Sequence, residues 1–237
     1  MAMKERLFRF KQFSVRHELS AMKVGMDGVL LGAWAAVDGA RRILDAGCGC
    51  GLIALMCAQR NAGARIDAID VHALSVEEAS FNFAASPWSG RLDASVCDFM
   101  KWRKTGYDVI ISNPPFFKSG LEVPVTDRET ARHAAALSPE ALLRHGAGLL
   151  SEKGRISLVA TPEWEADLAS VCVSYGLAVT RLCRVRGSEL GYVKRVLMEF
   201  SPAACGRYSE TELSVESAPG IYTEAYKTLT EEFYLNF

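Results

Sequence analysis

Arg42-Ile43-Leu44-Asp45-Ala46-Gly47-Cys48-Gly49-Cys50-Gly51 is the stretch that decides the fold. It joins an apolar strand to a loop of three alternate glycines, and the helical sequence 52–60 follows directly. Glycines at a strand-to-helix turn let the main chain approach a ligand closely, and they leave the N–H groups at the helix start exposed. The stretch therefore predicts a ligand-binding α/β domain.

Two cofactor classes use a glycine loop of this kind. The run Gly49-Cys50-Gly51-Leu52-Ile53-Ala54 fits the dinucleotide spacing, which keeps an NAD enzyme among the alternatives. The acid before the glycines favours the other class, because Asp45 with Gly47, Gly49 and Gly51 resembles the D-x-G-x-G-x-G loop of class I S-adenosylmethionine-dependent methyltransferases. In that class the loop acid serves the methionine end of the cofactor.

Polar residues also follow three later segments that have the pattern of strands. Asp70, Asp98 and Asn113 each come directly after an apolar run. The carboxyl ends of parallel strands share one crevice in an open α/β sheet, so we expect these side chains to lie beside the glycine loop. Asp70 suits the ribose hydroxyls of either cofactor, whereas an acid at Asp98, with Phe99 beside it, corresponds to the adenine border in methyltransferases.

The turn after the third run predicts a site for a planar amino group. Asn113 offers one acceptor oxygen, while Pro114 and Pro115 contribute carbonyls and no N–H, so acceptors gather around one spot. An exocyclic NH2 of a base, or a carboxamide NH2, could bond to Asn113 and the Pro114 carbonyl while its plane stacks on Phe116. A proline-stiffened surface turn is the structural alternative.

Length and composition indicate one domain. The 237 residues, 49% of them hydrophobic, can bury a full core. We expect a single methyltransferase domain over 1–237, in which residues 1–40 form an N-terminal extension on the cofactor and substrate side. The fold class is α/β: a Rossmann-like, doubly wound, mostly parallel seven-stranded sheet with an antiparallel closing strand.

Composition also limits the location and the cofactors. The seven cysteines form no Cys-x-x-Cys pair and the four histidines are scattered, which indicates a reduced environment and no metal site. The N-terminus lacks a signal-peptide core, and no apolar run reaches membrane-spanning length. We expect a cytoplasmic monomer without membrane contact. The net charge of −1 means that a nucleic-acid partner would need a local basic patch.

Three segments combine the residue types that bind RNA, and each has a structural alternative. Aromatic and basic residues interleave from Phe8 to Phe13, which suits either single-stranded RNA or an N-terminal strand packed under the domain. Segment 117–137 suggests either a substrate lid or a solvated loop, with phosphate contacts from Lys118, Arg128, Arg132 and His133. A third, basic run either flanks the crevice or protects strand edges: Arg181, Arg184, Arg186, Lys194 and Arg195.

The remaining elements follow from periodicity and end signals. Ser138 is expected to cap a helix with Pro139 in its first turn. Further helices are predicted at 26–36, 74–85, 163–175 and from 221 onward, and further strands at 154–160, 177–185 and 195–200.

Several stretches together resemble the bacterial valine-tRNA adenine-N6 methyltransferase family: Phe10-Lys11-Gln12-Phe13, Ala21 to Gly25, Asp27-Gly28-Val29-Leu30-Leu31-Gly32-Ala33-Trp34, Ile111 to Pro115, and the tail from Tyr226 to Leu235. This resemblance covers nearly the whole chain. It implies methyl transfer from S-adenosylmethionine, leaving S-adenosylhomocysteine, to the adenosine 3′ of the anticodon in the anticodon stem-loop of a tRNA. It also implies a cofactor site of Asp45, Gly47, Gly49, Gly51, Asp70, Asp98, Phe99 and Asp27, and a target-base site of Asn113, Pro114, Pro115 and Phe116.

Two positions depart from the family pattern. Phe116 stands where tyrosine is familiar and Met26 where threonine is familiar. The Asn-Pro-Pro-Phe form also occurs in ribosomal-RNA guanine-N2 methyltransferases, and protein glutamine-N5 methyltransferases share the turn. These two activities are the first alternatives, and an RNA-binding module without catalysis or an NAD dehydrogenase comes after them. The 44 residues before Asp45 are too few for the helical N-terminal domain that the glutamine enzymes usually carry.

Overall fold

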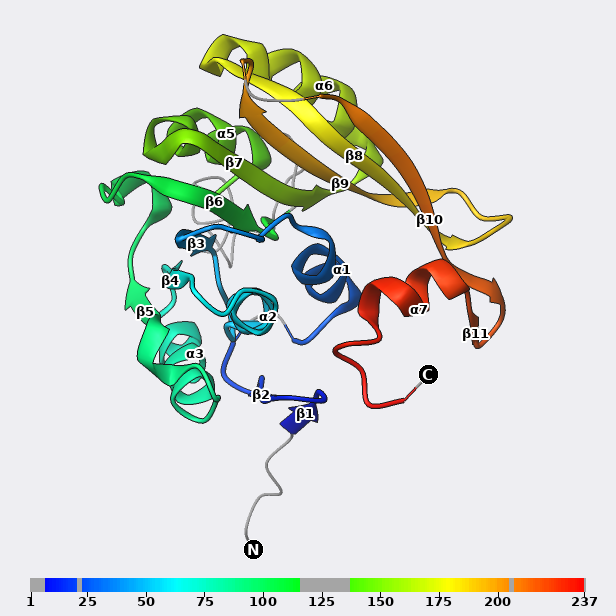
Figure 1. Cartoon of the computed structure of the whole chain (residues 1–237), viewed down its shortest axis with the longest axis horizontal. Coiled ribbons are helices and arrows are strands. Elements are labelled where there is room, and N and C mark those ends of the chain that lie inside the picture. The colour runs from blue at the N-terminus through cyan, green and yellow to red at the C-terminus, as the bar shows by residue number, and fades with distance from the viewer. Residues whose placement is uncertain (1–6, 21–22, 116–136, 205–206, 237) are drawn as a thin grey trace, which may run out of the picture.

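The computed structural model describes residues 7–20, 23–115, 137–204 and 207–236. Within these residues one central sheet has nine strands in the order β11-β10-β8-β9-β7-β6-β3-β4-β5, and helices cover both of its faces (Figure 1). Its strands are β3 (Arg42–Ala46), β4 (Arg65–Asp70), β5 (Leu92–Val96), β6 (Tyr107–Ser112), β7 (Leu150–Ala160), β8 (Leu177–Ser188), β9 (Val193–Pro202), β10 (Ser209–Ala218) and β11 (Ile221–Tyr222). The helices are α1 (Met26–Trp34), α2 (Leu52–Arg60), α3 (Ala73–Ala84), α5 (Pro139–Gly146), α6 (Glu165–Val171) and α7 (Glu224–Thr230).

Alternate residues of the inner strands supply two separate cores. In β3, Ile43 packs into the core under α1, α2 and α7, whereas its neighbour Leu44 packs into the core under α5 and α6. Both faces of the inner strands are therefore apolar, as parallel strands between two helical layers require. β3, β4, β5, β6 and β7 pair in parallel, and β9 runs antiparallel between β7 and β8.

The predicted α/β class is confirmed, and the strand count is corrected from seven to nine. The two additional strands are β10, which pairs in parallel with β8, and β11, which pairs with β10. The sequence of β10 is mostly Ser, Thr and Glu, and only Leu213 and Val215 are buried, so its apolar signal is weak. The predicted helix 163–175 is also divided, because 3-10 turns precede and follow α6.

The aromatic N-terminal segment packs against the C-terminal tail. β1 (Leu7–Arg9) and β2 (Ser14–Arg16) form a separate hairpin. Between them Phe10 and Phe13 are buried and stack with centroids 4.7 Å apart, and the Phe10 ring lies 5.9 Å from that of Tyr234. The Lys11 N–H donates to the Phe233 carbonyl at 2.8 Å. Of the two interpretations of this segment, core packing holds for Phe10 and Phe13.

Two side chains of α3 hold segment 16–20: Glu78 bonds its last three residues, and Asn82 joins its first residue to the glycine loop. The buried Glu78 carboxylate accepts bonds from the backbone N–H groups of Glu18, Leu19 and Ser20 at 2.5, 2.9 and 2.9 Å. One turn further, the Asn82 carboxamide donates to the Cys50 carbonyl of the glycine loop at 2.8 Å and bonds both backbone groups of Arg16. Segment 16–20 is thereby held close to the loop.

The Glu78 contacts generate a stability prediction. Burial alone would raise the pKa of Glu78, but the bonds from Leu19, Ser20 and Glu18 outweigh it and hold the pKa below 4.5. We expect Glu78→Gln to lower the free energy of unfolding by about 1.5–3 kcal/mol at pH 7 in urea titrations, since one acceptor oxygen becomes an amide donor.

The pH dependence follows from the lowered pKa. The Glu78 contribution is present above about pH 4.5 and is lost as the pH falls through the folded-state pKa, so the gap between wild type and Glu78→Gln should close in acid. The neighbouring exposed Glu77→Gln is the matched control. Equal losses in the two variants at pH 7 would contradict the assigned role.

Candidate active site

The ends of four parallel strands converge at one edge of the sheet. Asp45 in β3 is in register with Ala68 of β4 and Ile111 of β6, so the loops after these strands emerge together. The Gly47 and Cys48 N–H groups donate to the Ile69 carbonyl at 2.8 and 3.0 Å, which lays the glycine loop across the end of β4. This carboxyl edge is where open α/β sheets bind their ligands.

Each glycine of the loop has a left-handed backbone, but an added Cβ would meet different surroundings at each position. The φ angles of Gly47, Gly49 and Gly51 are 74°, 53° and 80°. A Cβ on Gly51 would lie 2.5 Å from the Phe83 ring, and one on Gly47 would lie 2.5 Å from a Leu137 methyl carbon. Within the described residues a Cβ on Gly49 would meet nothing within 4 Å, so Gly49 presents bare backbone to open space where a ligand could lie.

Asp45 is fully buried beneath this loop and is only half satisfied. Its Oδ2 accepts a bond from the Ala54 N–H at 3.0 Å, whereas Oδ1 is buried with no hydrogen-bond partner among the described residues. Burial raises the pKa of Asp45 to about 7 despite the Ala54 bond, and the negative charge of Asp70 raises it further. A cationic donor would satisfy Oδ1 and favour the charged form.

Asp70 and Asp98 shape the loops after β4 and β5. Asp70 accepts bonds from the Gly49 N–H and the His72 N–H, both at 2.9 Å, and so joins the glycine loop to the start of α3. Asp98 caps a short turn by accepting from the Met100 N–H at 2.9 Å. Each carboxylate has lone pairs left for ligand hydroxyls. The Phe99 ring is buried and packs edge-to-face on His145 at 5.1 Å.

Asn113 supplies the second orphaned acceptor at this edge. The Ser112 hydroxyl donates to the Ala46 carbonyl at 2.7 Å, which ties the end of β6 to the end of β3. The next residue, Asn113, has a buried Oδ1 that lacks a hydrogen-bond partner in the described part of the chain. Pro114 is buried and Pro115 is partly exposed. Phe116 and the predicted lid residues Lys118, Arg128, Arg132 and His133 lie outside the described residues.

Asp27 lies in the first turn of α1 and makes an ion pair with the sheet. Its Oδ2 accepts from the Arg195 Nε at 2.8 Å, so this carboxylate joins α1 to β9. The resemblance assigned Asp27 to the cofactor site; the geometry gives it a partner on the protein itself. Nothing in the sequence near Asp27 indicates that Arg195, far along the chain, is this partner.

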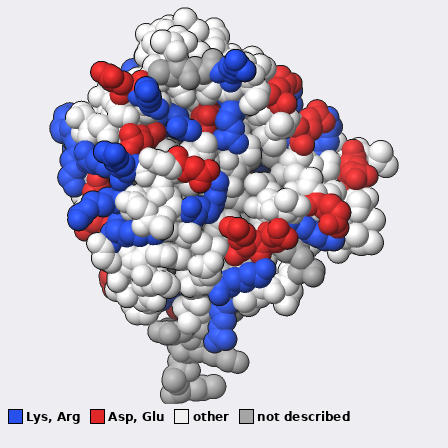
Figure 2. Space-filling model, viewed as in Figure 1, with Lys and Arg blue, Asp and Glu red and all other residues white. Residues whose placement is uncertain are grey.

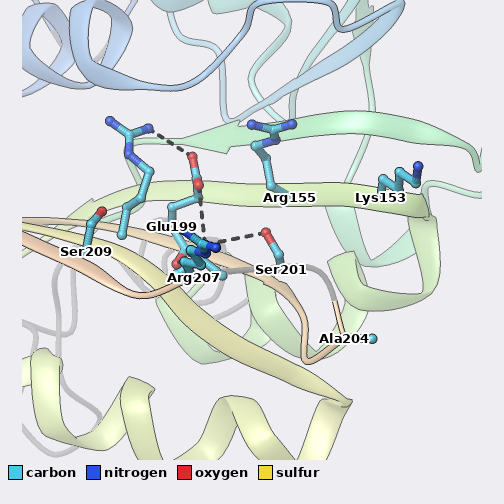
Figure 3. Close-up of a pocket in the computed structure, with 9 residues that line it drawn as sticks. Lys153, Arg155, Glu199, Ser201, Ala204, Arg207 and Ser209 are labelled. Atoms are coloured by element: carbon cyan, nitrogen blue, oxygen red, sulfur yellow. Dashed lines mark hydrogen bonds and ion pairs between the residues drawn. The ribbon is translucent and has the colours of Figure 1, made fainter.

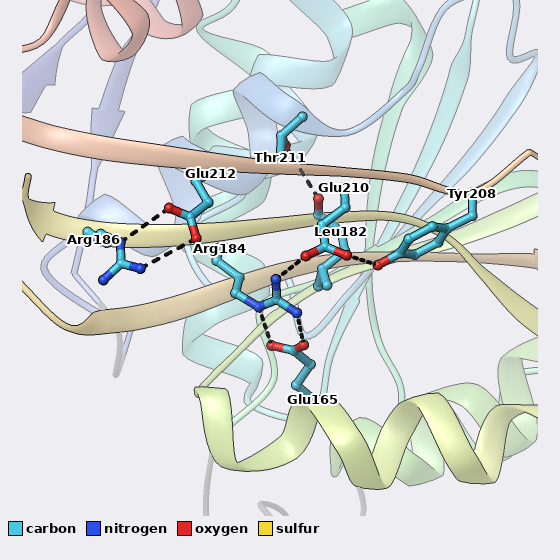
Figure 4. Close-up of polar contacts among 8 residues, drawn as sticks. All are labelled: Glu165, Leu182, Arg184, Arg186, Tyr208, Glu210, Thr211 and Glu212. Carbon is cyan, nitrogen blue, oxygen red and sulfur yellow. Dashed lines mark hydrogen bonds and ion pairs between the residues drawn. The ribbon is translucent and has the colours of Figure 1, made fainter.

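The other arginines of the predicted basic run are also paired with carboxylates. Arg184 bonds to Glu165 of α6 and to Glu210 of β10, and Arg186 bonds to Glu212 (Figure 4). Figure 2 shows positive and negative side chains intermixed over the face that it displays. These arginines therefore cross-link β8, β10 and α6, and their charges are largely balanced.

A pocket of about 600 Å³ lies away from the carboxyl edge (Figure 3). It is lined by Lys153 and Arg155 of β7, Thr180 and Arg181 of β8, and Glu199 and Ser201 of β9, with Ala204, Arg207 and Ser209. Its β7 residues come from the first half of that strand, and its β9 residues come from the last half of β9. Because β9 is antiparallel to β7, both sets lie near the amino end of β7. None of the sequence motifs indicated it. It does not contain the four strand-end residues.

The described residues contain neither a candidate membrane-spanning helix nor a candidate metal cluster. No helix in the described ranges is long and apolar enough to span a membrane. No group of three His, Cys, Asp or Glu side chains in those ranges could hold a metal ion.

The chain is similar in sequence to known methyltransferases. Residues 28–169 match the family model described as "Methyltransferase small domain". The chain is 42% identical over 230 residues to a tRNA1(Val) (adenine(37)-N6)-methyltransferase of Phocaeicola vulgatus, with 97% of each chain covered. It is 40% identical to the protein of the same name in Vibrio campbellii, with 96% and 95% covered, and 38% identical to that of Escherichia coli O157:H7, with 96% and 94% covered.

Solved structures support the fold. A predicted O-methyltransferase of Agrobacterium tumefaciens superposes with a TM-score of 0.68 at 20% identity, over 87% of this chain and 96% of that one. A TehB-like SAM-dependent methyltransferase of Corynebacterium glutamicum gives 0.51 at 19% identity, over 77% and 90%. The fold is that of class I methyltransferases.

The half-satisfied Asp45 generates a pH prediction. Its folded-state pKa, about 7, lies above the ordinary value of 3.8, so its favourable contribution is complete below about pH 4 and is lost as the pH rises through 7. We expect ligand-free Asp45→Asn to gain stability relative to wild type between pH 5 and pH 8 in urea titrations. The exposed Asp93→Asn serves as control. A pH-independent difference between Asp45→Asn and wild type would contradict the raised pKa.

Proposed function

This chain belongs to the tRNA1(Val) (adenine(37)-N6)-methyltransferase family. We therefore propose that it methylates N6 of adenine 37 in tRNA1(Val), with S-adenosylmethionine as the methyl donor. The observation that carries the assignment to this site is the buried Asn113 Oδ1 at the carboxyl edge, which has no hydrogen-bond partner among the described residues. An acceptor held without a partner in the ligand-free protein awaits a donor, and an adenine amino group is one.

The cofactor site consists of the glycine loop and the acids around it. Gly49 offers backbone beside open space, and Asp45 Oδ1 offers an acceptor suited to an ammonium group. Asp70 and Asp98 retain acceptor capacity for ribose hydroxyls and the adenine border. When bound, S-adenosylmethionine supplies a methyl group already activated on a sulfonium. The protein residues therefore have to position the two reactants and exclude water, and they do not have to activate the donor.

The target-base site is the Asn113 turn. Asn113 Oδ1 and the Pro114 carbonyl would accept the two N6 hydrogens, which directs the nitrogen lone pair and stabilises the positive charge that grows on N6 during transfer. Alignment of this kind can lower a barrier by about 7–11 kcal/mol. Phe116 would supply the stacking face. No strong base is required, because the methylated aminium loses its proton readily.

The RNA must present its base outside the stack. An unpaired anticodon-loop nucleotide leaves its neighbours at a cost of a few kcal/mol, less than a paired base would pay. The N-terminal extension, residues 1–40, is proposed to border this site, since its segment 16–20 is fastened to α3, which in turn bonds the glycine loop. The partner is thus a tRNA anticodon stem-loop.

Gly49 and Gly51 allow the cofactor site to be tested apart from the fold. We expect Gly51→Ala to destabilise by several kcal/mol, because a left-handed Cβ would clash with Phe83. Gly49→Ala should cost only about 1–2 kcal/mol but weaken S-adenosylmethionine binding strongly in calorimetry, since its methyl projects into open space. If Gly49→Ala binds like wild type, the cofactor does not lie against this residue.

Asn113→Ala tests the catalytic assignment. Because the lost oxygen acts on the amine and not on the donor, we expect unchanged S-adenosylmethionine binding and a fall in turnover on the order of 100-fold or more. The assay is transfer of labelled methyl to unmodified tRNA1(Val), followed by nucleoside digestion and mass spectrometry. Unchanged turnover would contradict the role of Asn113. Label in N2-methylguanosine, or in protein, would replace adenine by one of the alternative targets.

A further inference from the structure

The hairpin between β8 and β9 projects from the same edge as the target-base site. β7 runs parallel to β6, β9 is antiparallel to β7, and β8 is antiparallel to β9. The end of β8 and the start of β9 therefore lie at the carboxyl edge, with the loop that follows β6. Figure 1 shows this hairpin extending at the right of the view.

The hairpin tip exposes apolar and aromatic surface that the domain does not use. The Tyr192 side chain is 75% exposed and Leu190 is fully exposed at 102%. The Lys194 Nζ lies 5.9 Å from the Tyr192 ring centroid, over its face. Within the described residues no carboxylate lies within ion-pair distance of Lys194, in contrast to the neighbouring arginines.

A β-bulge lies at Lys194. The register passes from Val185 opposite Arg195 to Arg186 opposite Val193, so Lys194 is the extra residue of β9. Bulges redirect side chains and are frequent beside active sites. The stem of Lys194 crosses Gly187, where a Cβ would lie 2.9 Å from its Nζ. A side chain at position 187 would displace this lysine from its place beside Tyr192.

Further bonds hold the tip in one conformation. The Gly191 N–H donates to the Ser188 carbonyl at 2.9 Å, and the Arg186 guanidinium donates to the Gly191 carbonyl at 2.8 Å. The Glu189 N–H donates to the Glu216 carbonyl of β10 at 3.1 Å. At its base the hairpin is tied to α1 through Arg195 and Asp27, so Tyr192 is presented in a fixed position relative to the carboxyl edge.

We propose that Tyr192 stacks on an unpaired nucleotide of the loop that carries the target adenine and that Lys194 contacts a phosphate of the same loop. This inference rests on the proposed function, which brings a single-stranded loop to this edge. An aromatic face binds any base, and an unpaired lysine ammonium attracts the backbone. Because the tip is already ordered, binding loses little conformational entropy.

The test is binding of a fluorescein-labelled anticodon stem-loop RNA of tRNA1(Val) sequence, read by anisotropy. Tyr192→Ala should raise the RNA Kd about 5- to 100-fold, whereas Tyr192→Phe, which keeps the ring, should stay within about twofold of wild type. Tyr208→Ala is the matched control: Tyr208 is 56% exposed and precedes β10, at the opposite edge of the sheet. The KM for S-adenosylmethionine should not change in any of these variants.

Lys194→Gln supplies a second readout. Removal of one phosphate contact should lower the slope of log Kd against log salt concentration by about one. An unchanged slope, or equal RNA affinity in Tyr192→Ala and Tyr208→Ala, overturns the contact. If Tyr192→Ala lost self-association and kept its RNA affinity, the tip would be a protein interface, and this result would also overturn the RNA contact. Methyl transfer by the wild type is measured in parallel: its absence overturns the proposed function itself, while its presence with equal affinities overturns only this contact.

Discussion

The hydrogen bond from the Gly49 N–H to the Asp70 carboxylate is the contact on which the site depends. It links the loop after β3 to the loop after β4, and Gly49 makes it with a left-handed backbone that glycine accepts without strain. Asn82 then bonds both the Cys50 carbonyl of the same loop and the Arg16 carbonyl, which holds Arg16 beside the loop. Parallel strand register brings the elements together, and these few polar bonds set the surface that they form.

The site also stores unfavourable energy. Asp45 Oδ1 and Asn113 Oδ1 are both buried without a partner among the described residues. An unsatisfied buried polar atom costs about 1–3 kcal/mol, and the rest of the fold has to offset it. The inner strands can do so because their two faces are buried in separate apolar cores. Both orphaned atoms are acceptors, and both of the proposed ligand groups are amines.

The sequence predicted the placement of the strand-end residues better than it predicted the margins of the fold. Strand-end acids and the glycine loop are local signals, and parallel topology brings them together, so Asp45, Asp70, Asp98 and Asn113 were expected at one edge. The polar strand β10 lacked the alternation that identifies a strand. The Asp27–Arg195 and Arg184–Glu210 pairs join residues distant in the chain, and charge patterns do not reveal such partners. The N-terminal aromatic run had two equal interpretations, and burial decided between them for Phe10 and Phe13.

The contact between the N-terminal hairpin and residues 233–234 has a consequence for biosynthesis. The hairpin is translated long before Phe233, whose carbonyl accepts the Lys11 N–H, and Tyr234, whose ring lies beside that of Phe10. On the ribosome, Phe10 and Phe13 therefore stay without these neighbours until residues 233 and 234 have emerged. A chain that terminates before residue 233 would keep the aromatic rings of the hairpin more exposed, which would make it a target for chaperones and proteases.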